Sequence, residues 1–197
     1  MEQLNQALFL LMNAQDPNPV LLTIAKLCAN QLIWLVPMAV LVGWLSGAEK
    51  TRKFMLQATA AAILGMLLNQ LIGLVWQHPR PFVMGLGHNF VPHAADSSFP
   101  SDHLTLLLAV AFSFLLHQRL RVIGLMLTLM GLPVAWSRIY VGLHFPLDML
   151  GAVVFAALST GLGVVTAKWY LEPAYYCAST LHRRMFAPFI RRGWMVK

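Results

Sequence analysis

Long apolar runs constrain this chain more than any other feature of its sequence. Five of them are expected to be helices that cross a bilayer, because about 20 apolar residues in a helix span its hydrocarbon core. The five expected spans are Val20–Leu45, Phe54–Trp76, His103–Leu116, Val122–Trp136 and Pro146–Trp169. The sequence therefore predicts an all-α fold, a polytopic membrane helix bundle with five transmembrane helices.

The composition agrees with a membrane protein of one domain. Hydrophobic residues make up 58% of the chain and charged residues only 11%, whereas soluble domains carry about 25% charged residues. We find no linker, internal repeat or low-complexity tract, so residues 1–197 are expected to form a single domain. The apolar segment Gln3–Asn13 precedes a Pro-rich helix breaker and is expected to lie as a short helix in the membrane interface.

The N-terminal residues and the two cysteines each allow a further prediction. The start Met1-Glu2-Gln3 has no basic region and no cleavage site of small residues, so no cleaved signal peptide is expected. The two cysteines, Cys28 and Cys177, cannot form a disulfide framework and are expected to be free thiols.

The basic residues indicate which helix ends face the cytoplasm. The first connection, the third connection and the C-terminal region hold all but three of the 14 Lys and Arg residues. Five spans place these regions on one side, which the positive-inside rule makes cytoplasmic. This distribution explains the net charge of +7 without nucleic acid. Residues 181–197 are expected to form a basic cytoplasmic tail on anionic lipid.

Two polar connections, residues 77–102 and 137–145, are then expected on the outer side. Arg80 and Arg138 lie there against the positive-inside rule, so a function must retain them. The third and fourth spans are short, because about 15 residues give about 22 Å, less than the roughly 30 Å hydrocarbon core. Their outer ends are expected to lie at the depth of the lipid headgroups.

The outer connections carry what a metal-free phosphate ester hydrolase needs, namely cationic donors, a nucleophile and an acid. Arg80 and Arg138 can each bind phosphate through two N–H groups. Ser101 follows Pro100 and begins the third span, where free backbone N–H groups and the helix dipole favour an anion.

His144 and Asp148 lie four residues apart where the fifth span begins. They can share one helical face, or Pro146 can leave His144 in the loop with Asp148 in the first turn. In either geometry the carboxylate accepts a hydrogen bond from one ring nitrogen and leaves the other as a neutral nucleophile. His103 remains as the acid that protonates the leaving oxygen.

The spacing of these residues resembles the signature of the type 2 phosphatidic acid phosphatase (PAP2) superfamily. Its three parts match Arg80-Pro81, Pro100-Ser101-Asp102-His103, and Ser137-Arg138 followed by His144 and Asp148. Residues 93–103, the N-terminal segment and the five spans are similar to bacitracin-resistance-type undecaprenyl pyrophosphate phosphatases.

The resemblance implies a fold of the PAP2/haloperoxidase type and roles for the matched residues. It implies a phosphohistidine at His144, oriented by Asp148, with His103 as general acid and no metal or other cofactor. Phosphate would be held by Arg80, Ser101 and Arg138.

The chain departs from the superfamily pattern at two positions. Gly73 stands where the pattern has a lysine, seven residues before Arg80, so one phosphate contact is missing. Asp102 stands where a glycine is usual. We include Asp102 in the phosphate site, where it must point away from the phosphate or share a proton.

Other polar residues near the outer side allow two interpretations. His78 is expected to assist with a second phosphate, whereas His88 is expected to be a solvated loop residue. Zinc could bind the histidines of this connection in principle, but they lack a ligand spacing. Lys26 either takes part in interhelical hydrogen bonding, as expected for Asn69 and Gln70, or replaces the charge missing at Gly73.

The sequence therefore predicts an enzyme that hydrolyses undecaprenyl pyrophosphate to undecaprenyl phosphate and phosphate. The resemblance implies a site on the outer face of a bacterial plasma membrane, recycling of the cell-wall lipid carrier and bacitracin resistance. Alternatives are a phosphatase for phosphatidylglycerophosphate, phosphatidate or diacylglycerol pyrophosphate, and a lipid A phosphotransferase. A lipid-binding or transport protein is the alternative from another class, but it would not need the intact His103, His144 and Asp148.

Overall fold

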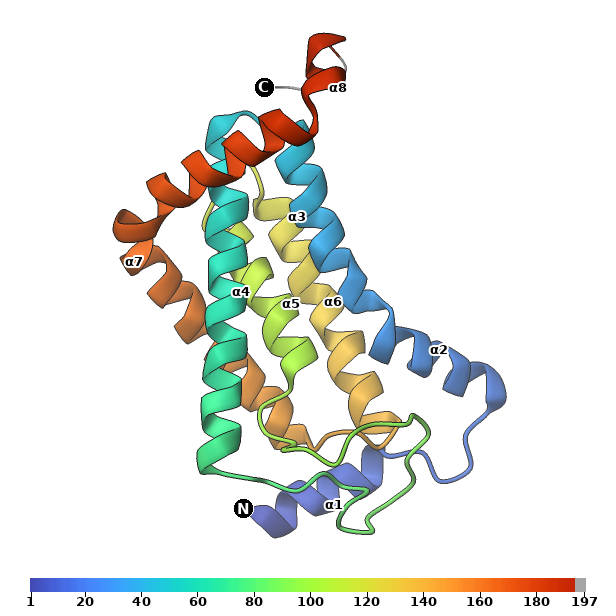
Figure 1. Cartoon of the computed structure of the whole chain (residues 1–197). Helices are drawn as coiled ribbons and strands as arrows, with labels where there is room; N and C mark the ends of the chain where they lie inside the picture. Colours follow the sequence, from blue (N-terminus) through green and yellow to red (C-terminus); the bar gives the residue numbers. More distant parts are fainter. Residues whose placement is uncertain (194–197) are drawn as a thin grey trace.

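The apolar runs fold into a bundle of helices, and the computed structural model describes residues 1–193 of the chain (Figure 1). Helices are the secondary structure that satisfies backbone polar groups in lipid, and the described residues contain no strand. Four helical segments are long and apolar enough to cross a membrane: Pro19–Ser46, Glu49–Val75, Arg121–Tyr140 and Pro146–Met185. The all-α membrane fold is thus confirmed, while Asp102–Leu115, a shorter apolar helix, leaves the count of five spans open.

The N-terminal segment forms a short helix, α1 (Glu2–Met12), which lies across one end of the bundle (Figure 1). Its Phe9 is fully buried and meets the ring of Phe145 edge-on, with 5.2 Å between centroids. The predicted short N-terminal helix is confirmed, and this contact ties it to the connection before the last long helix.

The first span is broken, which differs from the predicted single helix Val20–Leu45. It consists of α2 (Pro19–Asn30), a 3-10 turn η1 (Leu32–Trp34) and α3 (Leu35–Ser46). Pro37 explains the break, because a proline removes one backbone donor and its ring clashes with the carbonyl four residues earlier. As a result, α2 leans away from α3 toward the end of the bundle that carries α1 (Figure 1).

The centre of the bundle is α5 (Asp102–Leu115), which packs against its neighbours α4 (Glu49–Val75), α6 (Arg121–Tyr140) and α7 (Pro146–Met185). Small residues allow close packing of these helices. A Cβ at Gly65 of α4, for example, would lie 3.0 Å from Thr105 Cγ2 and 3.1 Å from Ser159 Oγ. Helix α5, the shortest of these four, is therefore held on several sides by the longer three.

Helix α6 is longer than predicted. Ser137 and Arg138 lie inside its last turns, so their predicted place in a connection is wrong, as is the prediction of a short fourth span. The helix continues through Pro133 and ends shortly before Gly142, which has a φ of +87°. A side chain at Gly142 would also collide with the carbonyl oxygen of His88.

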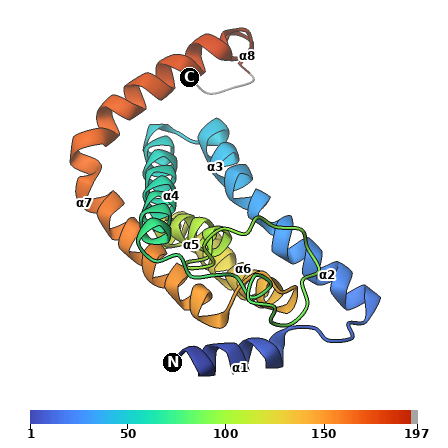
Figure 2. The same cartoon turned by 60° about the horizontal axis from the view of Figure 1, so that its bottom comes forward.

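Helix α7 continues to Met185, past the predicted end at Trp169, and a short helix α8 (Ala187–Arg191) follows. Pro173 bends rather than ends α7. The part beyond the bend crosses over the ends of α3 and α4 (Figures 1 and 2). There Arg52, which is almost fully buried, donates to the carbonyl of Trp44 at 3.0 Å and lies 3.2 Å from His182 Nε2.

The C-terminal region is thus partly helical, and the positions 194–197 of the predicted tail lie outside the described residues. Both cysteines are free, as predicted. The long connection between α4 and α5 crosses the ends of α5 and α6 that lie nearest α1 (Figure 2). This covered end of the bundle is where the predicted site residues meet.

Candidate active site

A cavity of about 300 Å³ lies beneath the long connection, at the ends of α5 and α6. Five of the predicted site residues, separated by up to 64 positions in sequence, line it together. The full lining consists of Ile33, Met66, Arg80, His93, Asp96, Asp102, His103, Leu106, Arg138 and His144. The polar residues of both outer connections are therefore brought to one place.

His144 reaches this cavity because of the turn after α6. Leu143 N donates to the carbonyl of Arg138 at 3.0 Å, which folds the chain back over the end of α6. Pro146 then begins α7, so His144 is a loop residue and Asp148 lies in the first helical turn. Of the two predicted geometries, the one with His144 before Pro146 is the one observed.

Three groups surround Nδ1 of His144. The carbonyl oxygen of Ser98 lies at 3.0 Å and Asp148 Oδ2 at 3.3 Å, with Ser98 Oγ at 3.4 Å. A carbonyl oxygen can only accept, so this network assigns the ring proton to Nδ1. The other nitrogen, Nε2, then keeps its lone pair.

Asp148 is itself held firmly, in a fully buried position. Its Oδ2 accepts hydrogen bonds from the backbone N–H of Phe145 at 2.8 Å and from Ser98 Oγ. The carboxylate thus caps the first turn of α7 and supports the His144 ring at the same time. An orienting group fixed in this way keeps the imidazole in one position.

The two arginines converge on Nε2 of His144. Arg80 Nη1 lies 3.1 Å from it and Arg138 Nη2 lies 3.3 Å from it. Arg80 is anchored by Asp96 at 2.8 Å, and Arg138 by the carbonyl of Ala29 in α2 at 3.0 Å. Two guanidinium groups directed at one uncharged nitrogen form a site for an anion at that point.

The imidazole of His144 is neutral near pH 7. Burial lowers its pKa to about 4; the hydrogen bond to Asp148 opposes this shift, and the charge of Arg138 adds to the lowering. A neutral ring with its proton on Nδ1 can act as a nucleophile through Nε2 without first losing a proton. The geometry and the protonation state therefore fit the same chemistry.

The start of α5 contributes the third group of predicted residues. Ser101 is fully buried, its N–H donates to the carbonyl of Asp148 at 3.3 Å, and its Oγ has no hydrogen-bond partner. Asp102 Oδ1 accepts from Asn69 Nδ2 at 2.8 Å, so its carboxylate is engaged by α4. His103 lines the cavity beside Arg138 and His144.

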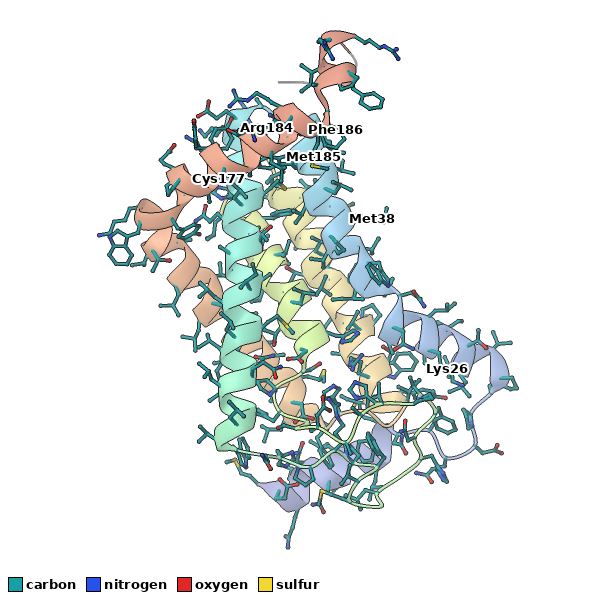
Figure 3. The ribbon with its side chains drawn as sticks, in the orientation of Figure 1. Lys26, Met38, Cys177, Arg184, Met185 and Phe186 are labelled. Atoms are coloured by element: carbon teal, nitrogen blue, oxygen red, sulfur yellow. The ribbon has the colours of Figure 1, made fainter. Side chains whose placement is uncertain are left out.

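Two predicted auxiliary residues lie elsewhere. Lys26 is on α2 (Figure 3) and is not among the residues that line the catalytic cavity. His78 lines a neighbouring polar cavity of about 410 Å³, together with Gly73, and lies 3.4 Å from Glu2. Their predicted roles at the phosphate remain predictions.

Sequence reasoning missed several functional groups. Ser98 supplies both a carbonyl and a hydroxyl to the His144–Asp148 pair, and Asp96 holds Arg80. Ser98 lies close to the Pro100–His103 motif, and this was the one feature of the sequence that pointed to it. The role of its backbone carbonyl could not be predicted, because every residue has a carbonyl. The predicted interhelical role of Asn69 is confirmed, because it also donates to Thr105 at 3.1 Å.

The PAP2 superfamily profile matches residues 54–172, which include every residue described around His144 except Ala29 and Ile33. The chain belongs to the PAP2 superfamily. YbjG of Escherichia coli (strain K12) is 36% identical over 196 residues, covering 99% of this chain and 98% of that protein. Undecaprenyl-diphosphatase BcrC of Bacillus subtilis (strain 168) is 43% identical over 141 residues, covering 72% of each.

Solved structures show the same fold. The crystal structure of Aquifex aeolicus LpxE matches with a TM-score of 0.64 at 22% identity, covering 82% of this chain and 94% of that one. A PAP2-type phosphatidylglycerolphosphate phosphatase from Bacillus subtilis matches with a TM-score of 0.61 at 20% identity, covering 86% of this chain and 87% of that one. The superfamily profile, the undecaprenyl-diphosphatase relatives and the long apolar helices together make the chain a multi-pass membrane phosphatase.

Proposed function

We propose that this PAP2 phosphatase hydrolyses undecaprenyl pyrophosphate to undecaprenyl phosphate and inorganic phosphate. The observation that carries the proposal is the neutral His144, with Nδ1 bound by Ser98 and Asp148 and Nε2 facing Arg80 and Arg138. The name of the BcrC relative supports the lipid pyrophosphate as substrate.

The first step transfers the terminal phosphoryl group to His144. Arg80 and Arg138 turn from Nε2 to the phosphate oxygens, which are the better acceptors because they are charged. The Nε2 lone pair then attacks phosphorus in line, a P–N bond forms and the bond to the bridging oxygen breaks. His103 gives its proton to the departing oxygen of the lipid monophosphate.

The second step releases phosphate by water. His103, now without its proton, removes a proton from a water molecule that attacks the phosphohistidine, and the P–N bond breaks. Asp148 stabilises the positive charge that the His144 ring carries in the intermediate. The buried Ser101 Oγ and Arg138 Nε, which have no hydrogen-bond partners, are donors that a bound phosphate would satisfy.

We place this reaction on the outer face of a bacterial plasma membrane, with the C-terminus in the cytoplasm. The cavity lies at one end of the bundle, whereas the ends of α3 and α8, near the basic residues, lie at the other end (Figure 1). Such an enzyme would recycle the cell-wall lipid carrier and so give bacitracin resistance. Its partners are the lipid substrate and the surrounding membrane lipids.

The test is phosphate release from purified lipids in detergent, with and without EDTA. The panel contains undecaprenyl pyrophosphate, phosphatidylglycerophosphate, phosphatidate and diacylglycerol pyrophosphate. We expect the highest kcat/KM for undecaprenyl pyrophosphate, no effect of chelator, and a loss of at least about a thousandfold in His144→Ala. Faster hydrolysis of another lipid would contradict the substrate, and loss of activity with EDTA would contradict the metal-free mechanism. No release from any lipid would favour a binding or transport protein.

A further inference from the structure

Helix α1 lies across the end of the bundle that carries the catalytic cavity (Figures 1 and 2). Asn5 and Phe9 share one face of this helix, and Asn13, its C-cap residue, continues the same row at a spacing of four. All three are buried, whereas Leu4 and Leu11 are exposed. Two buried asparagines on one face need polar partners inside the protein.

Asn13 binds one end of the segment that carries the nucleophile. Residues 140–147, called here the His144 loop, link the last residue of α6 to the first turn of α7. Asn13 Nδ2 donates to the carbonyl of Tyr140 at 3.1 Å and to that of His88 at 2.9 Å, while Oδ1 accepts from the N–H of His88 at 2.8 Å. The side chain thus joins the long connection to the His144 loop, and both of its polar atoms are in use.

Asn5 binds the other end of the His144 loop. Its Oδ1 accepts a hydrogen bond from the backbone N–H of Leu147 at 3.0 Å. The first N–H groups of a helix have no partner within that helix, so Asn5 caps α7 from a different helix, in the way that an N-cap side chain does. Asn5 Nδ2 has no hydrogen-bond partner within the described residues 1–193, so the side chain acts here only as an acceptor.

Between these two attachments, aromatic contacts hold Phe145. Its ring meets Phe9 of α1 edge-on, with 5.2 Å between centroids, and meets His78 in the same manner at 5.4 Å. Phe145 is fully buried and directly follows His144 in the chain. The residue next to the nucleophile is therefore packed against α1 as well.

We infer that Asn5 and Asn13 are positioning residues, which fix Nε2 of His144 by holding both ends of the His144 loop. Neither asparagine is among the described residues that line the catalytic cavity, so both act through the loop and not on the phosphate. A displacement of about 1 Å in a reacting group can lower a rate about a hundredfold. The inference rests on the proposed role of His144 as nucleophile and adds to it the helix that holds its loop.

The test uses the different hydrogen bonds of the two asparagines. Asn5→Asp keeps the oxygen that accepts from Leu147, whereas Asn5→Leu removes it. Asn13→Asp replaces Nδ2, the donor to two carbonyl groups, with another acceptor. We expect kcat to fall about 10- to 100-fold in Asn5→Leu and in Asn13→Asp. Because aspartate caps a helix about as well as asparagine, Asn5→Asp should keep kcat within about threefold of the unmodified enzyme.

Phosphate affinity should not change in these variants, because the phosphate contacts are anchored elsewhere. Arg80 is held by Asp96, and Arg138 is held by the carbonyl of Ala29 in α2. We expect KM and the inhibition constant of inorganic phosphate to stay within about twofold in every variant. The kinetics use the lipid of the panel that the unmodified enzyme hydrolyses fastest, so the outcome does not depend on which lipid that is.

Orthovanadate separates a displaced nucleophile from partly unfolded enzyme. It mimics the five-coordinate transition state of in-line attack, so its inhibition constant should rise as far as kcat falls. A lower kcat with an unchanged inhibition constant for vanadate would indicate an inactive fraction of enzyme and would overturn the inference. A parallel loss of affinity for inorganic phosphate would overturn it too, because the whole site would then be disturbed.

Gln6→Leu is the matched control, because it makes the same change from amide to leucine at the next residue of α1. Gln6 Nε2 donates to Glu2 Oε1 within the helix at 3.1 Å. We expect its kcat to stay within about twofold of the unmodified enzyme. A loss equal to that of Asn5→Leu would assign the effect to α1 as a whole and contradict the role of Asn5.

Hydrogen exchange tests the attachment of the loop without turnover, so a failure of the proposed function is distinguishable from a failure of this inference. The full-length protein is measured in detergent without substrate. We expect faster exchange of the His144 loop in Asn5→Leu and Asn13→Asp, and unchanged exchange of α5. Unchanged exchange of the His144 loop, or faster exchange together with an unmodified kcat, would overturn the inference even if every lipid phosphate is hydrolysed.

Discussion

The reactivity of His144 depends on four residues from three separate parts of the chain. Ser98 and Arg80 come from the long connection, Arg138 from α6 and Asp148 from α7. The positions of Arg138 and Asp148 relative to His144 could be predicted from their spacing in the sequence. Arg138 lies near the end of α6 and Asp148 near the start of α7. The contribution of Ser98 could not, because it depends on how a loop of irregular structure folds back over the imidazole.

Ser98→Ala removes the hydroxyl donor to Asp148 and keeps the backbone carbonyl that faces His144. A hydrogen bond to a charged group contributes about 1.5–3 kcal/mol, so we expect kcat to fall about 10- to 100-fold. KM should change little, because the hydroxyl does not line the cavity. Steady-state kinetics on undecaprenyl pyrophosphate measures both parameters.

Ser97→Ala is the matched control for this substitution. The Ser97 hydroxyl lies 3.4 Å from the carbonyl of Trp76 and 3.3 Å from that of Phe99, and neither contact involves His144. We expect its kcat to stay within about twofold of the unmodified enzyme. If both variants lose activity equally, the effect belongs to the loop as a whole and the assigned role of Ser98 is wrong.

At the scale of the elements, the hydrophobic pattern of the sequence predicted where the helices lie, but it did not predict where they bend and end. The break before α3 follows from Pro37, which the apolar run of the first span concealed. It has a functional consequence, because Ile33 of the turn lines the cavity and the Ala29 carbonyl of α2 holds Arg138. Because of the break, α2 departs from the line of α3 while it packs against α6.

The end of α6 gives a second case at this scale. The fourth span is predicted to end at Trp136, but the helix continues to Tyr140. Arg138 is therefore presented from a regular helix, which holds a side chain more firmly than a loop does. Helix ends depend on where a breaker such as Gly142 lies, and aromatic residues near an interface do not determine them.

At the scale of the whole molecule, hydropathy predicted the class of fold, which is confirmed, whereas the orientation predicted from charge stays a prediction. Figure 3 shows Cys177 and Arg184 together on the far part of α7, at the end of the bundle opposite the long connection. The length of α7 was not predicted, because the residues after Trp169 are polar enough to resemble a tail. The buried contacts of Arg52 beyond the bend explain why this part still packs on the bundle.

Cysteine labelling tests the proposed orientation. Cys177 is exposed, and with Cys28→Ser it becomes the one thiol of the chain. In right-side-out spheroplasts, we expect a membrane-impermeant maleimide to label Cys177 only after the membrane is permeabilised. Gln15→Cys, in the exposed connection after α1 and in a background with both native cysteines replaced by Ser, should be labelled in intact spheroplasts. The opposite pattern would contradict an outward-facing site.

The central claim is that His144 forms a covalent bond to the terminal phosphate, and trapping that intermediate tests it most directly. The enzyme is mixed with undecaprenyl pyrophosphate that is radiolabelled in the terminal phosphate, and is quenched in alkali within one turnover, because phosphohistidine survives alkali but not acid. We predict an acid-labile label on the peptide that contains His144, and none in His144→Asn. Label on another residue, or single-turnover hydrolysis by His144→Asn at the unmodified rate, would contradict the account.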